Sequence, residues 1–212
     1  MDPPEFDDGA AWEPPPKLPG AGYDVIAIVS SAGGLEALST VLSGLPDHFP
    51  AAITIVQHLD PRHRSLMSDI LSRRSGMPSK QAQEGDKLQP GTIFLAPPDY
   101  HLLVNSDGTL SLSHTALVHF VRPSGDLLFE SVAASYRDRV IAVVLTGTGS
   151  DGEMGVRAVN AMGGTVIVQD PGTAAFAGMP QAAIRTGAVD FVLELQEIAP
   201  AIARLVIGEE DS

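Results

Sequence analysis

Apolar residues occur along this chain in short continuous runs, and each run ends at a polar or glycine-containing segment. The runs are rich in valine, isoleucine and alanine and do not alternate regularly with polar residues. Runs of this kind are typical of strands that are buried on both faces, as in a parallel sheet. The strands predicted in this way are 25–29, 51–58, 91–96, 140–145, 165–168 and 189–193.

Segments with apolar residues at three- and four-residue spacing separate these strands. After the first run, Leu35, Leu38 and Leu42 recur on one face of a helix. Strands that alternate with helices indicate βαβ units, with parallel strands and helices on both faces of the sheet. The sequence therefore predicts an α/β fold with a doubly wound, mostly parallel sheet. Further helices are expected at 65–75, 126–136, 154–162, 180–186 and 198–206.

Two segments depart from this alternation. Residues 102–104 and 109–112 flank Asn-Ser-Asp-Gly at 105–108, which predicts a β-hairpin with Asp-Gly in its turn. Residues 1–22 are rich in proline and acidic side chains and contain little to bury, so a disordered tail is expected there. The folded domain is expected to span 23–208.

Charge and composition narrow the possible partners. The 212 residues include 26 acidic and 13 basic side chains, a formal net charge of -13, which disfavours nucleic acid and anionic membranes. The chain has no cysteine, so it has no disulfide, thiolate nucleophile or cysteine-ligated metal. No apolar run approaches the roughly 20 residues of a membrane-spanning helix, and the N-terminus lacks a signal-peptide pattern. We therefore expect a cytoplasmic protein without membrane insertion.

Polar residues follow several of the predicted strands, at the edge where ligands bind in open α/β sheets. Ser31, preceded by Ser30, follows the first strand; His58 ends the second, and Asp151 follows the strand at 140–145. A serine hydroxyl needs a base to accept its proton, and a carboxylate can orient an imidazole base. These residues predict a site with a nucleophilic serine. The nucleophile is Ser31 or Ser30, the base is His58, and His101 is the reserve base.

A different pattern overlaps this one at 147–152, where Gly-Thr-Gly-Ser-Asp-Gly has the form G-x-G-x-x-G. It lies between a predicted strand and a predicted helix, and Asp170 ends the next strand, as in a dinucleotide-binding fingerprint. However, Asp151 would place a carboxylate in the turn that must hold a pyrophosphate. The motif also comes late in the chain. Dinucleotide binding therefore stays an alternative, and no cofactor is expected.

Two further clusters are candidate sites. His58, Asp60 and His63 lie close together in sequence, but their spacing matches no recurrent metal site, and no metal is expected. A basic cluster stands out in this acidic protein. Such a cluster is usually a solvated helix face, but beside His58 it could receive an acidic protein substrate. Its members are Arg62, Arg64, Arg73 and Arg74.

Several short segments occur together in an order that is far more specific than any one of them. The chain over residues 24–206 resembles the catalytic domain of the chemotaxis protein-glutamate methylesterases, the CheB family. The matching segments are Ala27-Ile28-x-x-Ser31-x-Gly33-Gly34, Gln57-His58, Leu95-Ala96-Pro97-Pro98, Arg122-Pro123-Ser124-x-Asp126-x-Leu128-Phe129, Leu145-Thr146-Gly147-x-Gly149-x-Asp151-Gly152, Gln169-Asp170 and Gly178-Met179-Pro180-x-Ala182-Ala183.

The resemblance implies a Ser–His–Asp triad in which Ser31 is the nucleophile, His58 the general base and Asp151 the residue that orients it. It also implies hydrolysis of glutamyl methyl esters on chemoreceptors or other methylated signalling proteins, with release of methanol, and deamidation of glutamine in many members. Backbone N–H groups near Ala32 and the helix start would stabilise the oxyanion. The cleft residues implied in this way are Ala32, Gly33 and Thr148.

The chain departs from the family's pattern at two positions. Val29 stands where the family usually has glycine, and Thr148 stands where it has methionine. From Val29 we expect an altered backbone at the serine turn. Both departures keep open a second hypothesis, a binding or adaptor domain that has lost efficient turnover. A receiver domain often precedes this catalytic domain in the family, whereas only the acidic tail is present here, so control by phosphorylation in cis is not expected.

Overall fold

The computed structural model describes residues 17, 22–58 and 66–208. Within this part of the chain, seven strands form one sheet in the order β3-β4-β2-β1-β7-β8-β9, and all neighbouring strands in it are parallel. The strands are β1 (Val25–Ser30), β2 (Ala52–Gln57), β3 (Ser79–Gln81), β4 (Ile93–Leu95), β7 (Val140–Val144), β8 (Thr165–Gln169) and β9 (Phe191–Leu193). The mostly parallel sheet predicted from the apolar runs is confirmed, and β3 is a strand that the pattern did not indicate.

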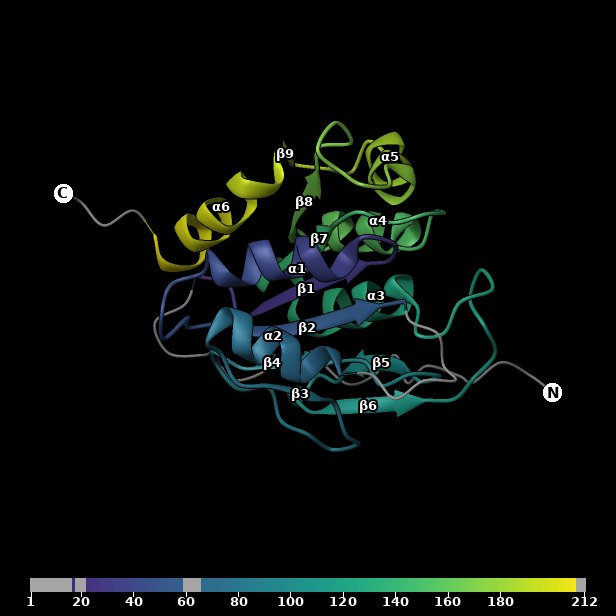
Figure 1. The fold of residues 1–212 in the computed structure, drawn as a ribbon. Helices are drawn as coiled ribbons and strands as arrows, with labels where there is room; N and C mark the ends of the chain where they lie inside the picture. The colour runs from purple at the N-terminus through teal and green to yellow at the C-terminus, as the bar shows by residue number, and fades with distance from the viewer. Residues whose placement is uncertain (1–16, 18–21, 59–65, 209–212) are drawn as a thin grey trace.

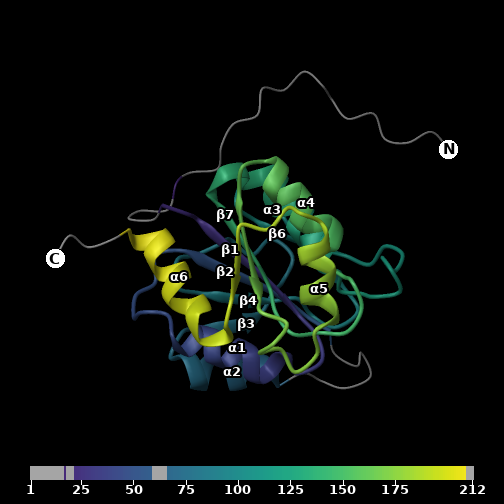
Figure 2. The same cartoon turned by 90° about the horizontal axis from the view of Figure 1, so that it is seen from above.

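Helices cover both faces of this sheet (Figures 1 and 2). On one face, Ile26 and Ile28 of β1 pack in a core with α1 (Gly34–Ser43), α2 (Met67–Ser75) and α6 (Leu195–Ile207). Because side chains alternate along a strand, Ala27 and Val29 face the opposite core. That core contains residues of α3 (Gly125–Tyr136), α4 (Glu153–Ala161) and α5 (Gly178–Arg185).

The predicted hairpin is present as β5 (His101–Val104) and β6 (Leu110–Ser113), an antiparallel pair outside the main sheet. Leu102, Val104 and Leu110 are buried in the same core as α3. The loop that leaves β6 leads into the start of α3. The hairpin therefore packs against the helix whose N-terminus lies at the edge of the sheet where the strands end.

The strand order reverses at the centre of the sheet. From β1 the chain builds outward through β2 and β4 on one side, and later through β7 and β8 on the other. A crevice forms at such a switch point beyond the carboxyl ends of the strands, and ligands of open α/β sheets bind there. The segments after β1, β2 and β7 meet in this region. In the described ranges, no helix is long and apolar enough to cross a membrane.

Candidate active site

The chain turns sharply from β1 into α1, and this turn carries Ser31. The Ser31 N–H donates to the Thr146 carbonyl at 3.0 Å, which joins the turn to the segment after β7. Gly33 has a φ of 77° in the left-handed region that favours glycine. A Cβ atom on Gly34 would lie 1.9 Å from Gln57 Oε1 and 2.8 Å from Ser30 Oγ, so any side chain there would force both groups to move. These two glycines fix Ser31 at the carboxyl edge of the sheet.

The two neighbouring serines have different surroundings. Ser30 is fully buried, and its hydroxyl donates to Gln57 Oε1 at 2.6 Å. Gln57 Nε2 donates in turn to the Ser31 carbonyl at 2.8 Å and to the His58 carbonyl at 3.0 Å. Ser31 is partly exposed, and its hydroxyl has no hydrogen-bond partner among the residues that the structure describes. Ser31 is thus the serine whose oxygen can reach a substrate.

His58 and Asp151 are brought together although 93 residues separate them in sequence. The His58 N–H donates to the Ser30 carbonyl at 3.1 Å, which places His58 beside the serine turn. His58 Nε2 lies 2.8 Å from Asp151 Oδ2, and the two side chains are 16% and 4% exposed. Because Asp151 accepts from Nε2, the nitrogen left for a substrate or a serine is Nδ1.

Asp151 is held mainly by the start of α3. Its carboxylate accepts hydrogen bonds from the Gly125 N–H at 2.6 Å, the Asp126 N–H at 3.2 Å and the Ser124 hydroxyl at 3.0 Å. Burial by itself would raise the pKa of Asp151, but the hydrogen bonds from His58 and Gly125 outweigh it and hold the pKa below its ordinary value. The positive end of the α3 dipole also favours the charged carboxylate. Asp151 is therefore ionised at neutral pH.

His101, the reserve base, has a different role. It is fully buried, its Nδ1 accepts a hydrogen bond from the Ser124 N–H at 3.1 Å, and its Nε2 lies 3.1 Å from the Ala116 carbonyl. Burial lowers its pKa, which favours the neutral ring that these two contacts require. Both nitrogens are occupied, so His101 does not act as the base; it fixes Ser124, which in turn holds Asp151.

The expected oxyanion donors lie on the serine turn. The N–H groups of Ala32 and Gly33 donate to no acceptor within the described residues, whereas Gly147 N–H is occupied by the Phe176 carbonyl at 2.9 Å. Thr148 is exposed, in the loop between β7 and α4. The turn that carries Ser31 therefore has two unused backbone donors, the kind of group that forms an oxyanion hole.

The serine turn does not include Val29, and an altered backbone at that turn stays a prediction. Val29 lies inside β1, opposite Val56 of β2 and Val144 of β7, and the turn begins only after Ser30. Its side chain packs against the start of α3, since a Cβ atom on Gly125 would lie 2.4 Å from Val29 Cγ2. The valine therefore fills space beneath the Asp151 carboxylate and leaves the strand backbone regular.

The G-x-G-x-x-G segment follows β7, as the pattern indicated, but its acidic side chain is already engaged. Asp151, which lies in this segment, accepts hydrogen bonds from His58 and from the Gly125 N–H at the start of α3. A carboxylate at this position would also repel a pyrophosphate. Asp170 Oδ1 accepts from the Gly172 N–H in its own loop at 2.7 Å. The geometry favours the serine site over the dinucleotide alternative.

The basic cluster is only partly placed. Arg62 and Arg64 lie outside the described residues. Arg73 and Arg74 occupy the last turn of α2 and are exposed. Arg74 Nη1 lies 2.8 Å from Glu36 Oε1 of α1, so this side chain joins two helices. A docking role for the cluster stays a prediction.

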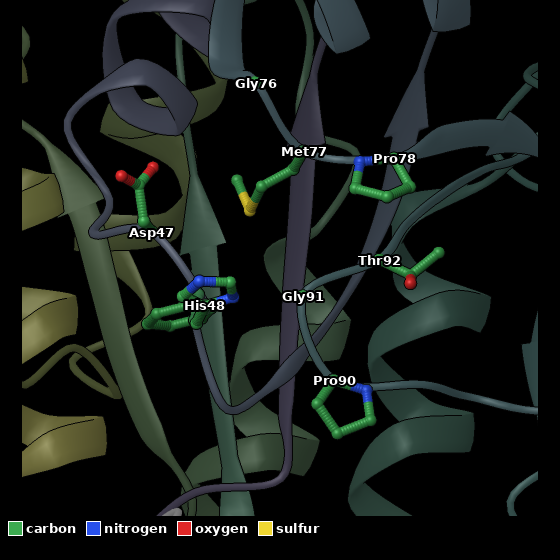
Figure 3. Close-up of a pocket in the computed structure, with 9 residues that line it drawn as sticks. Asp47, His48, Gly76, Met77, Pro78, Pro90, Gly91 and Thr92 are labelled. Atoms are coloured by element: carbon green, nitrogen blue, oxygen red, sulfur yellow. The ribbon is translucent and has the colours of Figure 1, made fainter.

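A cavity of about 570 Å³ lies away from Ser31, His58 and Asp151 (Figure 3). Its walls come from segments that precede β2 and β4 and that follow α2, at the amino edge of the sheet. The described residues contain no cluster of histidine and acidic side chains suited to a metal ion. The cavity is lined by Asp47, His48, Phe49, Gly76, Met77, Pro78, Pro90, Gly91 and Thr92.

Fold and geometry together describe a doubly wound α/β protein whose switch point carries a serine, a histidine and an aspartate, the groups of a serine hydrolase. Comparison with known families is consistent with this class. The model of the CheB methylesterase family matches residues 26–202, and the chain belongs to this family, as its resemblance implied.

Individual relatives cover most of the chain. A Leptospira interrogans protein is 43% identical over 183 residues, which are 86% of this chain and 95% of the relative. A Moorella thermoacetica protein named protein-glutamate methylesterase/protein-glutamine glutaminase is 41% identical over 91% of this chain, which matches 47% of that longer protein. The crystal structure of the Thermotoga maritima CheB methylesterase catalytic domain covers 86% of this chain and 98% of its own, with 34% identity and a TM-score of 0.83.

Proposed function

We propose that this protein is a serine hydrolase that removes methyl groups from glutamate side chains of a signalling protein. The observation that carries the proposal is the 2.8 Å contact between His58 and Asp151 beside the partly exposed Ser31. Membership of the CheB methylesterase family supports the same reaction. In this proposal Ser31, His58 and Asp151 are the catalytic residues.

The reaction follows from the positions of these groups. Ser31 Oγ attacks the ester carbonyl carbon while His58 Nδ1 accepts the hydroxyl proton, and the carbonyl oxygen becomes an anion. The N–H groups of Ala32 and Gly33 stabilise that anion. Collapse of the intermediate breaks the bond to the methoxy group, which leaves as methanol with the proton from His58. Water then attacks the acyl-enzyme with His58 as base and releases glutamate and Ser31.

Asp151 supports both steps through its negative charge. When His58 gains a proton, the adjacent carboxylate stabilises the imidazolium and keeps its ring oriented. The same site can act on a glutamine side chain, because ammonia can leave from the tetrahedral intermediate as methanol does. The glutaminase activity in the names of the relatives supports this second substrate.

The proposed partner is a methylated chemoreceptor or another methylated signalling protein in the cytoplasm. The substrate would be a protein, because the ester group itself offers few contacts and the family's named members act on protein glutamate. The alternative within the same fold is a binding or adaptor domain with little turnover.

Replacing each of the two neighbouring serines in turn tests the proposed mechanism. Methanol release from a methyl-labelled receptor fragment is expected to fall by at least about 10³-fold in Ser31→Ala and to persist in Ser30→Ala, the matched control. Labelling by a fluorophosphonate probe is expected in the wild type and lost in Ser31→Ala. Undiminished methanol release in Ser31→Ala would overturn the mechanism, and an unlabelled wild type that releases no methanol would favour the adaptor.

A further inference from the structure

The loop between β6 and α3 contains a very tight hairpin. Val118 and Val121 exchange two backbone hydrogen bonds, at 3.1 Å and 2.9 Å. The two residues between them, His119 and Phe120, have φ values of 46° and 69°. Positive φ at both central residues is the geometry of a type I′ turn, for which asparagine and glycine are the usual residues.

Phenylalanine is a costly choice for this turn. A bulky residue in the left-handed region is uncommon and strained, and such strain persists where function requires it. Phe120 gains nothing from the fold in return, since it is 94% exposed, the most exposed of the large apolar residues that the structure describes. The hairpin thus holds a phenylalanine ring in solvent at an energetic cost.

Several contacts fix the hairpin in place. Arg122 donates to Asp99 Oδ1 through Nε at 2.9 Å and through Nη2 at 2.6 Å, and its Nη1 donates to the Thr115 carbonyl at 2.6 Å. On the other side, His119 Nδ1 lies 3.3 Å from Asp126 Oδ2. The Phe120 ring is therefore presented from an ordered support, which lowers the conformational entropy lost when it binds.

The same contacts tie the hairpin to the candidate active site. Asp126, the partner of His119, donates its N–H to Asp151. His101, which fixes Ser124, contacts the Ala116 carbonyl at the base of the loop. In both views of the fold, the loop between β6 and α3 projects beyond the edge of the sheet where β2 ends (Figures 1 and 2). The loop that carries Phe120 thus lies at the edge of the sheet that carries the site.

We propose that Phe120 is an apolar anchor for the protein substrate and inserts between apolar side chains that flank the methylated glutamate. The inference rests on the proposed function. A hairpin tip is convex and forms no pocket for a small ligand, whereas a rigid exposed aromatic ring suits the apolar surface of a polypeptide. Leu117 of the same loop is 53% exposed and extends this contact. Binding energy from such remote contacts holds the ester carbonyl at Ser31.

The test separates contact with a protein from the chemistry of the site. Phe120→Gly suits a positive φ, so its thermal unfolding temperature is expected to equal or exceed that of the wild type. Its kcat/KM on a methyl-labelled receptor fragment is expected to fall at least about tenfold, equal to 1.4 kcal/mol. The rate at which a small fluorophosphonate labels Ser31 is expected to stay within twofold. Phe191→Ala, at a 43% exposed phenylalanine on the edge strand β9, is the matched control.

Each other outcome overturns the inference. Receptor kcat/KM within twofold of the wild type in Phe120→Gly would show that the ring does not contact the substrate. An equal fall in kcat/KM and labelling would make the hairpin a support of the site. A dimer in sedimentation that dissociates in Phe120→Gly, with receptor activity unchanged, would assign the ring to a second copy. Failure of the proposed function is separate, because it would appear as methanol release retained in Ser31→Ala or absent from the wild type.

Discussion

Two carboxylates are buried at opposite edges of the same sheet, and they are neutralised in different ways. Asp24 precedes β1 at the amino edge, is fully buried and forms an ion pair with Arg139, the residue before β7. Asp151 follows β7 at the carboxyl edge and contacts His58 together with neutral donors of the α3 start. One charge is matched by a permanent cation, and the other is stabilised mainly by dipoles.

The difference shows what distinguishes a structural carboxylate from one that can assist a reaction. The guanidinium of Arg139 is always charged, so the Asp24 pair contributes the same interaction throughout any reaction. The negative charge of Asp151 is available to an imidazolium that forms at His58 only when a proton is transferred. The neutral donors at the start of α3 therefore keep Asp151 ionised, and its negative charge stays available to stabilise the imidazolium of His58.

The largest effect is expected from removing the negative charge of Asp151. In Asp151→Asn the amide keeps the shape but no longer stabilises the imidazolium, so the rate of methanol release should fall by about 10³–10⁴-fold. In either orientation of the new amide, its NH₂ group would face a backbone N–H, that of Gly125 or that of Asp126. Steady-state assays of methanol release check this prediction. A rate within tenfold of the wild type would show that Asp151, like Asp24, is a structural carboxylate that does not assist the reaction.

The amino-edge carboxylate should show the opposite behaviour. Asp24→Asn removes the fully buried carboxylate that pairs with the half-buried Arg139, and breaking a buried ion pair costs about 3 kcal/mol of unfolding free energy. Urea unfolding measures the loss, while the activity of the folded fraction should equal that of the wild type. Lost activity with unchanged stability would contradict the comparison.

A smaller change should weaken the dipolar support itself. Ser124→Ala removes the hydroxyl that donates to Asp151 Oδ1 at 3.0 Å, and a hydrogen bond to a charged group contributes about 1.5–3 kcal/mol. Since hydrogen bonds hold the pKa of Asp151 below its ordinary value, losing one raises it. The titration profile of the Asp151 carboxyl carbon, followed by NMR, should then move to higher pH. An unshifted profile would show that the N–H groups of α3 suffice.

The smallest effect is expected at Asp126, beside Asp151. Burial raises the pKa of this carboxyl, and the nearby Asp151 charge raises it further against the hydrogen bond from Gly155. A raised native pKa means that stability falls as pH increases from the ordinary value near 3.8 through the native one. In Asp126→Asn the free energy of unfolding should no longer fall with pH in this way. Urea unfolding at a series of pH values between acidic and neutral measures this slope. An unchanged slope would assign the pH dependence elsewhere.

Much of the fold follows from the sequence because a buried parallel sheet needs continuous apolar strands. The runs at 25–29 and 140–145 indicated β1 and β7 for this reason. The apolar pattern did not predict β3, because Ser79, Lys80 and Gln81 are polar and only half-buried at the sheet edge. Its pairing depends on the neighbouring β4, which a local pattern does not reveal.

The candidate site was only partly predictable. Ser31, His58 and Asp151 stand at strand ends, so their meeting follows from topology. The hydrogen bonds from Ser124 and Gly125 to the carboxylate depend on how α3 docks, and these residues lie 27 and 26 positions before Asp151 in the chain. The turn at His119 and Phe120 carries neither glycine nor asparagine, so the usual turn signal was absent.

The close packing around Gly34 limits which residues can replace it. Any side chain there would collide with Gln57, whose amide also holds Ser30 and the carbonyls of Ser31 and His58. By contrast, Gly76 has a φ of 74° with nothing within 4 Å of its missing Cβ atom, so asparagine could replace it. In a library of all single substitutions selected for activity, position 34 should retain only glycine, whereas position 76 should accept others.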